Sequence, residues 1–392
     1  MLTLEQALDH LLASVQPVAD DARIPVHAAV GRYLSEPVLA PHALPLFDNS
    51  AMDGWAVRSS DGAGPLRSIA HIPAGQFFAG EIRAGECARI FTGSPLPRGA
   101  DAVAMQEDAR VNEAGGVSLL EPVKPWENVR FRGEDVKESA TIAERGQKVT
   151  APLASLFMAC GVGEINVHRT IRVAVLATGN ELREPGEVLQ LGEIHESNRV
   201  LVASMLRDIG AEPVLFPIVP DDFNSTVAAL RSASECDAVI TCGGVSVGEH
   251  DFVKGAIESL GGRVDFWRVA IKPGKPFAHA TISGKPLFGL PGNPVSTQVT
   301  LLLLARPALL KMSGAGDFSP TVSFGELAEP ISNRGDRRHF VRVSLDSNGL
   351  VRTSGPQASH RLASLARANG LLDVPAETDW EAGRKVKVLL FG

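Results

Sequence analysis

The chain has 392 residues, of which 44% are hydrophobic and 21% are charged, and its net charge is −7. This length exceeds one ordinary core, so we expect about three domains, and the composition excludes a disordered chain. The negative charge argues against a nucleic-acid surface. Four cysteines without a C-x-x-C pair argue against structural zinc and fit a reducing cytoplasm. The sequence has no signal-peptide pattern and no apolar run of membrane-spanning length, so we expect a cytoplasmic protein without membrane contact.

The first part of the chain mixes helical and β patterns. Apolar residues at helical spacing follow Thr3 and Gln6, a capping-box pair, and predict an opening helix. Short β-branched runs broken by Gly and Pro predict an irregular β domain over residues 46–140. We expect residues 1–45 and 141–170 to form an N-terminal linker and helical domain on either side of that insertion.

Strands and helices alternate through residues 171–315. This alternation implies a mostly parallel, doubly wound sheet with right-handed crossovers, and such sheets bind ligands outside the carboxyl ends of their strands. The pattern predicts strands at 172–177, 214–219 and 237–242 and helices at 198–209, 222–233, 251–260 and 295–312.

Residues 316–392 return to β patterns, with a hairpin signal at 347–349 and a closing strand at 385–390. We therefore predict an α/β multidomain fold. Its doubly wound sheet domain is joined to an irregular β-rich N-terminal domain and a small C-terminal β-barrel domain.

Carboxylates follow three of the predicted strands. Glu181, Asp221 and Asp251 all fall in turns at what should be one edge of the sheet. Carboxylates gathered there would repel one another and usually need Mg²⁺ or a proton. A plainer interpretation remains open, because aspartate is also a good helix N-cap: Asp251 could cap the helix that follows it, and so could Asp221 or Asp222.

Two strand-turn-helix patterns flank a lysine loop, and their N–H groups suit phosphates and other oxyanions. The loop holds Lys272 and Lys275 between prolines, so the whole predicts a site for a large, multiply charged anion. The first turn lacks the Walker A ending, and Asn-Pro in the second is also ordinary helix-start chemistry. The candidate residues of the turns are Gly243, Gly244, Ser246 and Gly248, and Pro291, Asn293, Pro294 and Ser296.

The order of the motifs resembles the molybdopterin molybdenumtransferase family, which includes bacterial MoeA and the E domain of gephyrin. The resemblance covers essentially the whole chain. Two departures are Asn180, where the family often has an acidic residue, and Trp55, where it often has a tyrosine; the first puts the metal shell in question. The motifs lie at 47–54 (FDNSAMDG), 91–95 (FTGSP), 132–135 (RGED), 178–182 (TGNEL), 197–198 (SN), 243–249 (GGVSVGE), 272–276 (KPGKP) and 290–296 (LPGNPVS).

The resemblance implies molybdenum cofactor biosynthesis: molybdate and adenylylated molybdopterin react with Mg²⁺, AMP leaves, and molybdenum stays on the dithiolene. It implies a homodimer with the site between subunits, and transient contact with a molybdopterin adenylyltransferase and with molybdoenzymes. The implied catalytic residues are Asp53, Thr92, Glu181, Asp221 and Asp251, the last three as magnesium ligands. Besides the turn residues, the implied substrate-binding residues are Arg132, Asp135, Lys272, Lys275 and Arg337.

Two other functions stay open. A molybdopterin adenylyltransferase resembles residues 171–313 alone, but the flanking domains would then be superfluous; ATP use without molybdate would favour it. A gephyrin-like scaffold is the alternative of another class, although the chain lacks the fused adenylyltransferase domain. A protein partner bound independently of cofactor substrates would favour the scaffold. An oxyanion-storage role explains the nucleotide-type turns poorly.

Overall fold

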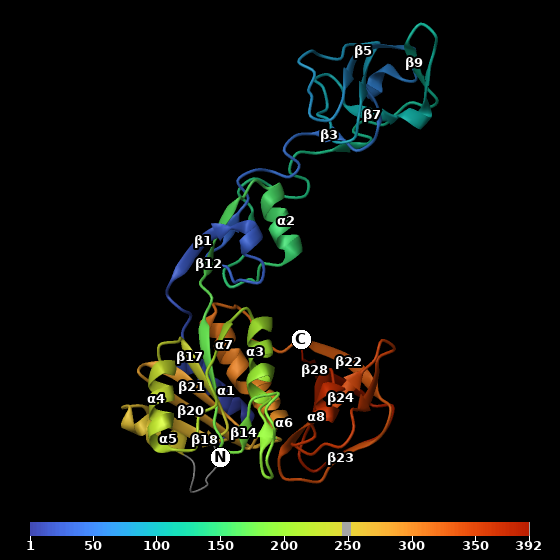
Figure 1. Cartoon of the computed structure of the whole chain (residues 1–392). Helices are drawn as coiled ribbons and strands as arrows, with labels where there is room; N and C mark the ends of the chain where they lie inside the picture. Colours follow the sequence, from blue (N-terminus) through green and yellow to red (C-terminus); the bar gives the residue numbers. More distant parts are fainter. Residues whose placement is uncertain (245–251, 392) are drawn as a thin grey trace.

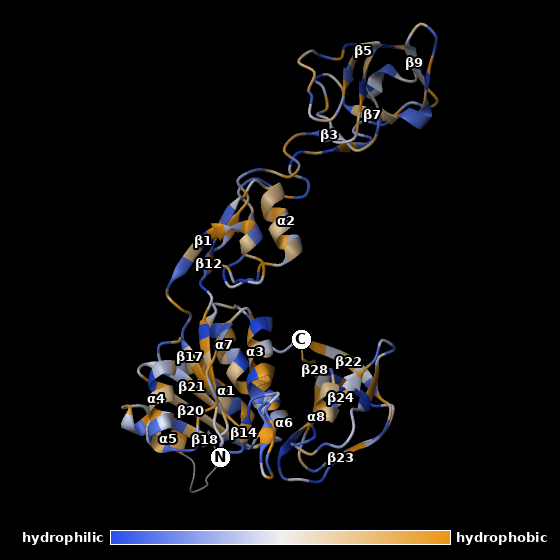
Figure 2. Cartoon of the chain, in the orientation of Figure 1, coloured by the Kyte–Doolittle hydropathy of each residue, from blue (hydrophilic) through white to orange (hydrophobic). Residues whose placement is uncertain are grey.

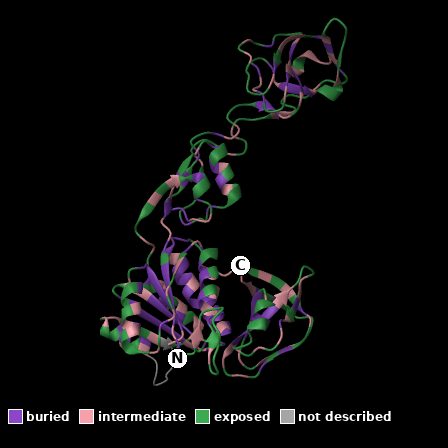
Figure 3. Ribbon diagram, viewed as in Figure 1, coloured by how far each residue is buried: buried purple, intermediate pink, exposed green. Residues whose placement is uncertain are grey.

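The computed structural model describes residues 1–244 and 252–391. These residues form four bodies along an elongated path (Figure 1). An α/β body and a C-terminal β body lie side by side at one end, together with both termini. A middle body connects the α/β body to an outer β body at the far end. The strands of the α/β body form the most continuous buried region (Figure 3).

The α/β body is built on a six-stranded sheet in the order β16-β13-β17-β21-β20-β18. The first four strands are parallel, whereas β20 and β18 are antiparallel to their neighbours. Successive residues of β13 enter two different apolar clusters, so both faces of the sheet are buried. The strands are β13 (Arg172–Ala177), β16 (Glu212–Leu215), β17 (Ala238–Cys242), β18 (Arg263–Arg268), β20 (Pro276–Ile282) and β21 (Lys285–Leu290).

Helices cover both faces of this sheet, which is apolar along its strands (Figure 2). The doubly wound α/β fold predicted from the alternating pattern is confirmed. One face carries α1 (Leu4–Ser14), α3 (Asn198–Asp208), α6 (Pro294–Thr300), η4 (Leu301–Ala305) and α7 (Arg306–Met312), and the other carries α4 (Phe223–Ala233) and α5 (Phe252–Ser259).

The first helix lies elsewhere than expected. The capping box is present as predicted, with the Gln6 N–H 3.2 Å from Thr3 Oγ1. Yet α1 packs on η4 and α7 in the α/β body, not in a linker domain made of residues 1–45 and 141–170. Ala7 and Leu11 are fully buried in the cluster that covers one face of the sheet. An amphipathic helix must bury its apolar stripe, and α1 does so against the helices on this face of the six-stranded sheet.

Two other predicted elements differ from their predicted form. The predicted helix 295–312 contains a π-helical turn, η4, just before Pro307, which has no N–H for the carbonyl four residues earlier. The predicted strand 214–219 ends as a regular strand at Leu215, although the Phe216 N–H still donates to the Val175 carbonyl at 3.0 Å. Val219 keeps only an isolated bridge to Thr178.

The middle body is small. Its core contains Leu34, Phe157 and Val167. It comprises β1 (Asp21–Pro25) antiparallel to β12 (Glu164–His168), β2 (Val38–Leu39) antiparallel to β11 (Thr141–Ala143), η1 (Val26–Ala28) and α2 (Ala151–Ala159).

The outer β body is a sheet in the order β7-β4-β6-β5-β9-β8. Its β-rich, irregular character is as predicted. It comprises β4 (Gly54–Val57), η2 (Ser59–Asp61), β5 (Leu66–Ile72), β6 (Glu86–Ile90), β7 (Ala102–Met105), η3 (Gln106–Asp108), β8 (Ala109–Val111) and β9 (Gly116–Leu119), with β3 (Asn49–Ser50) paired to β10 (Val129–Arg130) beside it.

The C-terminal β body is a closed barrel, as predicted, because β24 pairs with β26 as well as β25. A strand of the α/β body, β19 (Ile271–Lys272), extends its sheet by pairing with the start of β24. Its elements are β22 (Val322–Leu327), β23 (Ile331–Asn333), β24 (Arg338–Leu345), β25 (Leu350–Thr353), α8 (Leu362–Ala366), β26 (Gly370–Val374), β27 (Thr378–Trp380) and β28 (Lys385–Leu390).

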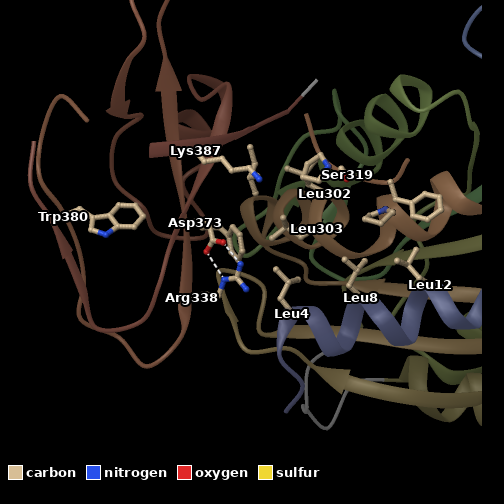
Figure 4. A pocket seen from close by; sticks show the side chains of 15 residues that line it. Leu4, Leu8, Leu12, Leu302, Leu303, Ser319, Arg338, Asp373, Trp380 and Lys387 are labelled. Carbon is tan, nitrogen blue, oxygen red and sulfur yellow. Dashed lines mark hydrogen bonds and ion pairs between the residues drawn. The ribbon is translucent and has the colours of Figure 1, made fainter. Parts of the chain in front are cut away.

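An apolar cavity of about 530 Å³ separates α1 from this barrel (Figure 4). Leu4, Leu8 and Leu12 line it from the helix. Arg338 spans its mouth, with its Nε 2.9 Å from Asp373 and a second ion pair to Glu5 of α1. Of the helices that the structure describes, none is long and apolar enough to cross a membrane.

Candidate functional site

The carboxyl edge of the α/β sheet brings two predicted turns together. The Asn180 N–H donates to Asp221 Oδ2 at 3.1 Å, and the Asp221 N–H donates to Asn180 Oδ1 at 3.0 Å. An aspartate at 180 would offer the same acceptor oxygen, but it would place a second negative charge beside Asp221. Asn180 therefore keeps the turn-to-turn geometry and lowers the local charge.

Neighbouring carboxylates at this edge do different things. Asp222 is the N-cap of α4, with its Oδ1 2.8 Å from the Ser225 N–H, and its contacts with Ser225 lower its pKa. Asp221 is instead turned toward Asn180. The exposed Glu181 folds over Gly179, where an added Cβ would lie 2.5 Å from Glu181 Oε2. The plain N-cap interpretation therefore holds for Asp222, while Glu181 and Asp221 remain available to a ligand.

Two of the three expected magnesium ligands, Glu181 and Asp221, lie among the described residues. Asp251, the third expected ligand, lies outside the described residues. Within residues 1–244 and 252–391, no group of three His, Cys, Asp or Glu side chains has an arrangement that could hold a metal ion.

The first glycine turn sits beside the second. Gly243 and Gly244 have φ of +91° and +65°, and a Cβ on Gly244 would lie 2.4 Å from Val253 Cγ2. The Gly243 N–H donates to the Leu290 carbonyl at 3.0 Å, which joins this turn to the strand leading into the second turn. Only glycine fits both positions, as phosphate-type turns require. Ser246 and Gly248 lie outside the described residues.

The second turn begins α6. Asn293 is its N-cap and Pro294 its first residue, as helix-start chemistry alone predicts. Thr297 Oγ1 donates to the Pro291 carbonyl at 2.5 Å, and Asn198 Nδ2 donates to the Gly292 carbonyl at 2.7 Å. Ser296, the third residue of α6, is only 5% exposed.

The lysine loop lies where the α/β body meets the C-terminal barrel. Lys272 and Lys275 are exposed, and Gly274 between them packs against Thr300 of α6. Arg337 Nη1 donates to the Ile271 carbonyl at 2.9 Å, which brings its guanidinium to the same loop.

Two further basic side chains on β24, which the sequence did not reveal, follow Arg337. Burial lowers the pKa of His339, which pairs with Lys272, to about 4, helped by the nearby cations Lys272, Arg342 and Arg337. Arg342 is fully buried, burial lowers its pKa, and its guanidinium donates to the Pro356 and Ala358 carbonyls inside the barrel rather than to the loop. Their positions, two and five residues after Arg337, were the available signal.

A separate group lies on the outer β body. The Thr92 N–H and Oγ1 both donate to Asp53 Oδ1 at 2.8 Å, and these bonds, with the more distant Arg89, lower the pKa of Asp53. The Arg89 guanidinium stacks over Trp55 and Phe91, 5.4 and 4.9 Å from their ring centroids. Arg89 was not predicted, because only Phe91 lies near it in the sequence and Trp55 comes beside it through the pairing of β4 with β6. Trp55 therefore contributes a ring face that holds the Arg89 guanidinium.

Arg132 and Asp135 belong to neither group. They lie in the ribbon between the outer β body and the middle body, where the Arg132 N–H donates to Asp48 at 2.7 Å and its guanidinium to Glu138 at 2.5 Å. The Asp135 N–H donates to the Leu44 carbonyl at 3.1 Å. Within one chain, then, the candidate residues occupy separate bodies: the outer β body, which carries Asp53 before β4, lies at the opposite end of the molecule from the α/β body, which carries Glu181 before β14 (Figure 1).

Comparisons with known proteins identify the family. Three family models match: the MoeA N-terminal region (domain I and II) at residues 2–161, the probable molybdopterin binding domain at 174–311, and the MoeA C-terminal region (domain IV) at 325–391. The molybdopterin molybdenumtransferase of Haemophilus influenzae is 36% identical, over 94% of this chain and 93% of its own. The chain belongs to the MoeA family of molybdopterin molybdenumtransferases.

Other MoeA relatives agree. Molybdopterin molybdenumtransferase 2 of Mycobacterium tuberculosis is 38% identical, over 98% of this chain and 97% of its own. The crystal structure of the molybdopterin biosynthesis moeA protein from Pyrococcus horikoshii OT3 superposes with a TM-score of 0.87 at 29% identity, covering all of both chains. The likeness therefore includes all four bodies, and the resemblance inferred from the motifs is confirmed.

Proposed function

We propose that this chain inserts molybdenum from molybdate into adenylylated molybdopterin, with Mg²⁺ and release of AMP, at a site shared between two chains. Its curated relatives are named molybdopterin molybdenumtransferases, which supports the transfer of molybdenum to molybdopterin. The adenylylated substrate, the magnesium ion and the shared site are the parts that we add. Four buried free thiols support a reducing, cytoplasmic setting.

The observation that carries this proposal is the separation of two chemically matched groups. The carboxyl edge offers Glu181 and Asp221 beside a cationic loop, whereas the outer β body offers an ionised Asp53 fixed by Thr92. The two lie at opposite ends of one elongated chain (Figure 1). A two-fold dimer would bring the outer β body of one chain to the carboxyl edge of the other and build two identical sites.

The α/β side of the site supplies charge for two anionic substrates. Lys272, Lys275 and Arg337 would hold oxyanion or phosphate oxygens, and fixed cations of this kind stabilise charge without reorganising during the reaction. The N–H groups of the two glycine turns would add donors for the pyrophosphate. Arg132 and Asp135, in the ribbon, would contact substrate only from the partner chain.

The donor set at this edge suits magnesium. Mg²⁺ favours oxygen ligands and typically takes one or two carboxylates together with substrate phosphates and water. Glu181 and Asp221 provide two carboxylates on adjoining turns, and Asp251 would be a third. When bound, the ion would neutralise phosphate charge at the anhydride.

A direct assay tests the reaction. Purified protein would be mixed with adenylylated molybdopterin, Mg²⁺ and either molybdate or tungstate, and both AMP and metal-loaded pterin would be quantified. We expect AMP release that depends on oxyanion and Mg²⁺, with one metal loaded for each AMP. ATP consumption with molybdopterin alone would point instead to an adenylyltransferase.

Subunit mixing tests the shared site. Asp53→Ala and Asp251→Ala homodimers should each be nearly inactive. In exchanged heterodimers one site carries both lesions and the other carries none, so activity should return toward half of wild type. Heterodimers that are confirmed by mass and remain inactive would show that both residues act within one chain.

A further inference from the structure

Two chain segments cross from the α/β body to the middle body, and Arg169 fastens both. One runs from α1 to β1 and carries Asp20; the other runs from β12 to β13 and carries Arg169 itself. The Arg169 N–H donates to the Asp20 carbonyl at 3.1 Å, and its Nε donates to Asp20 Oδ2 at 3.1 Å. The two crossing segments are therefore joined beside the α/β body.

The same guanidinium grips the α/β body. Nη1 and Nη2 donate to the two carboxylate oxygens of Asp237, each at 2.7 Å, in a bidentate pair. Asp237 immediately precedes β17, is 8% exposed, and also accepts the Arg172 N–H at 2.8 Å. Burial favours a raised pKa for Asp237, but Arg169 and the Arg172 N–H hold that pKa below its ordinary value. Arg169 is therefore paired with a carboxylate, Asp237, that is buried and ionised.

Close packing also joins the end of α7 in the α/β body to the middle body; we call the region where these two bodies meet the joint. Gly314, just after α7, has φ of +83°, and a Cβ there would lie 1.8 Å from Cδ2 of His168 in the middle body. The Gly316 N–H donates to the Gly146 carbonyl at 2.9 Å. The joint is therefore held both by the hydrogen bonds of Arg169 to Asp20 and Asp237 and by the close contacts of Gly314 and Gly316.

We propose that Arg169 is a positioning residue, whose clamp on Asp20 and Asp237 sets the direction in which the middle and outer bodies leave the α/β body. Because this arm is long (Figure 1), a small rotation at the joint becomes a large displacement of Asp53. A forked guanidinium fixes orientation, whereas a lysine ammonium fixes only distance. The consequence for turnover rests on the proposed shared site, but the effect on arm direction does not.

Spin-label distances test the arm direction without any substrate. Glu113→Cys on the outer β body and Arg231→Cys on α4 are exposed positions, while all four native cysteines are buried. Labelled chains diluted in excess unlabelled chains report distances within one chain. Arg169→Ala should shift or broaden the distance distribution, and Arg169→Lys should do so partially. The control, Arg23→Ala, removes an exposed ion pair with Glu164 inside the middle body and should leave the distribution unchanged.

Turnover provides the second measurement. Because Arg169 does not belong to either substrate group, its loss should leave the equilibrium affinity for molybdopterin unchanged and lower kcat by about tenfold, as misplaced reacting groups do. Asp237→Asn, which keeps the side-chain shape, replaces Arg169→Ala if that variant melts too early to assay. A distance shift together with the kcat loss supports the proposal. An unmoved distribution overturns it. Wild-type kcat despite a moved arm overturns the consequence for turnover and leaves the role in arm direction supported. A fully active Asp53→Ala would instead refute the shared site and leave the distance result standing.

Discussion

The carboxyl edge of the α/β sheet and the Asp53–Thr92 turn of the outer β body are built in opposite ways. The edge depends on tight contact between turns: Gly244 has no room for a Cβ beside Val253, and Asn180 and Asp221 each donate a main-chain N–H to the side-chain oxygen of the other. The outer turn depends on one exposed carboxylate, and its Gly93 faces open space. The edge should therefore be sensitive to shape at its glycines as well as to loss of its carboxylates, whereas the outer turn should be sensitive to loss of a single side chain.

The largest expected effect comes from removing carboxylates at the edge. Glu181→Ala and Asp251→Ala should each lower Mg²⁺-dependent AMP release by roughly a hundredfold or more, the usual scale for lost electrostatic assistance. Asp222→Ala is the matched control, because this neighbouring aspartate caps α4. It should lower the melting temperature slightly and keep turnover. Wild-type turnover in both test variants would remove the metal assignment.

The cationic loop should control how oxyanion is used. Lys272→Ala or Lys275→Ala should raise the molybdate concentration for half-maximal AMP release by about tenfold, since an acidic protein loses a local cation. Replacement by arginine should restore only part of this, because the guanidinium differs in shape. Lys254→Ala, whose side chain forms an exposed pair with Glu258, is the control. Unchanged half-saturation in both alanine variants would make these ordinary surface lysines.

A comparison of Gly244 and Gly93 distinguishes the cost of a steric clash from the cost of backbone strain. Both Gly244 and Gly93 have positive φ, so an alanine at either costs about 1–2 kcal/mol of backbone strain. Only at Gly244 would the new methyl also clash, 2.4 Å from Val253 Cγ2, adding about 1–3 kcal/mol. Urea unfolding should therefore rank Gly244→Ala as the less stable variant. Equal losses would contradict the tight packing of the edge.

The smallest effect concerns the protonation of Asp53. The Thr92 N–H and hydroxyl lower its pKa, so the carboxylate stays ionised, and this interaction persists, until pH falls through the lowered pKa. Thr92→Val removes the hydroxyl donor and should move the acid limb of the activity profile to higher pH. Thr92→Ser keeps the donor and should keep the limb. An identical acid limb in all three proteins would show that Asp53 ionisation does not limit turnover.

Much of this protein could be read from local patterns. The capping box at Thr3, the hairpin before Gly349 and the alternation through residues 171–315 are recorded in neighbouring residues, because caps, turns and periodicity act over a few positions. The ordered motifs were enough to name the family. Pro307 marks one limit, because its effect on helix geometry depends on neighbouring residues that periodicity alone does not reveal.

What the sequence determined by itself was therefore the type of each element, the fold class and the family. The tertiary structure alone decided that α1 completes the sheet's core, that Asp221 faces Asn180, and that Arg169 reaches Asp237. It also decided that the outer β body, which carries Asp53, lies at the opposite end of the chain from the α/β body, which carries Glu181 (Figure 1). Such pairings join residues tens of positions apart, and they depend on how whole apolar faces are buried rather than on any local preference.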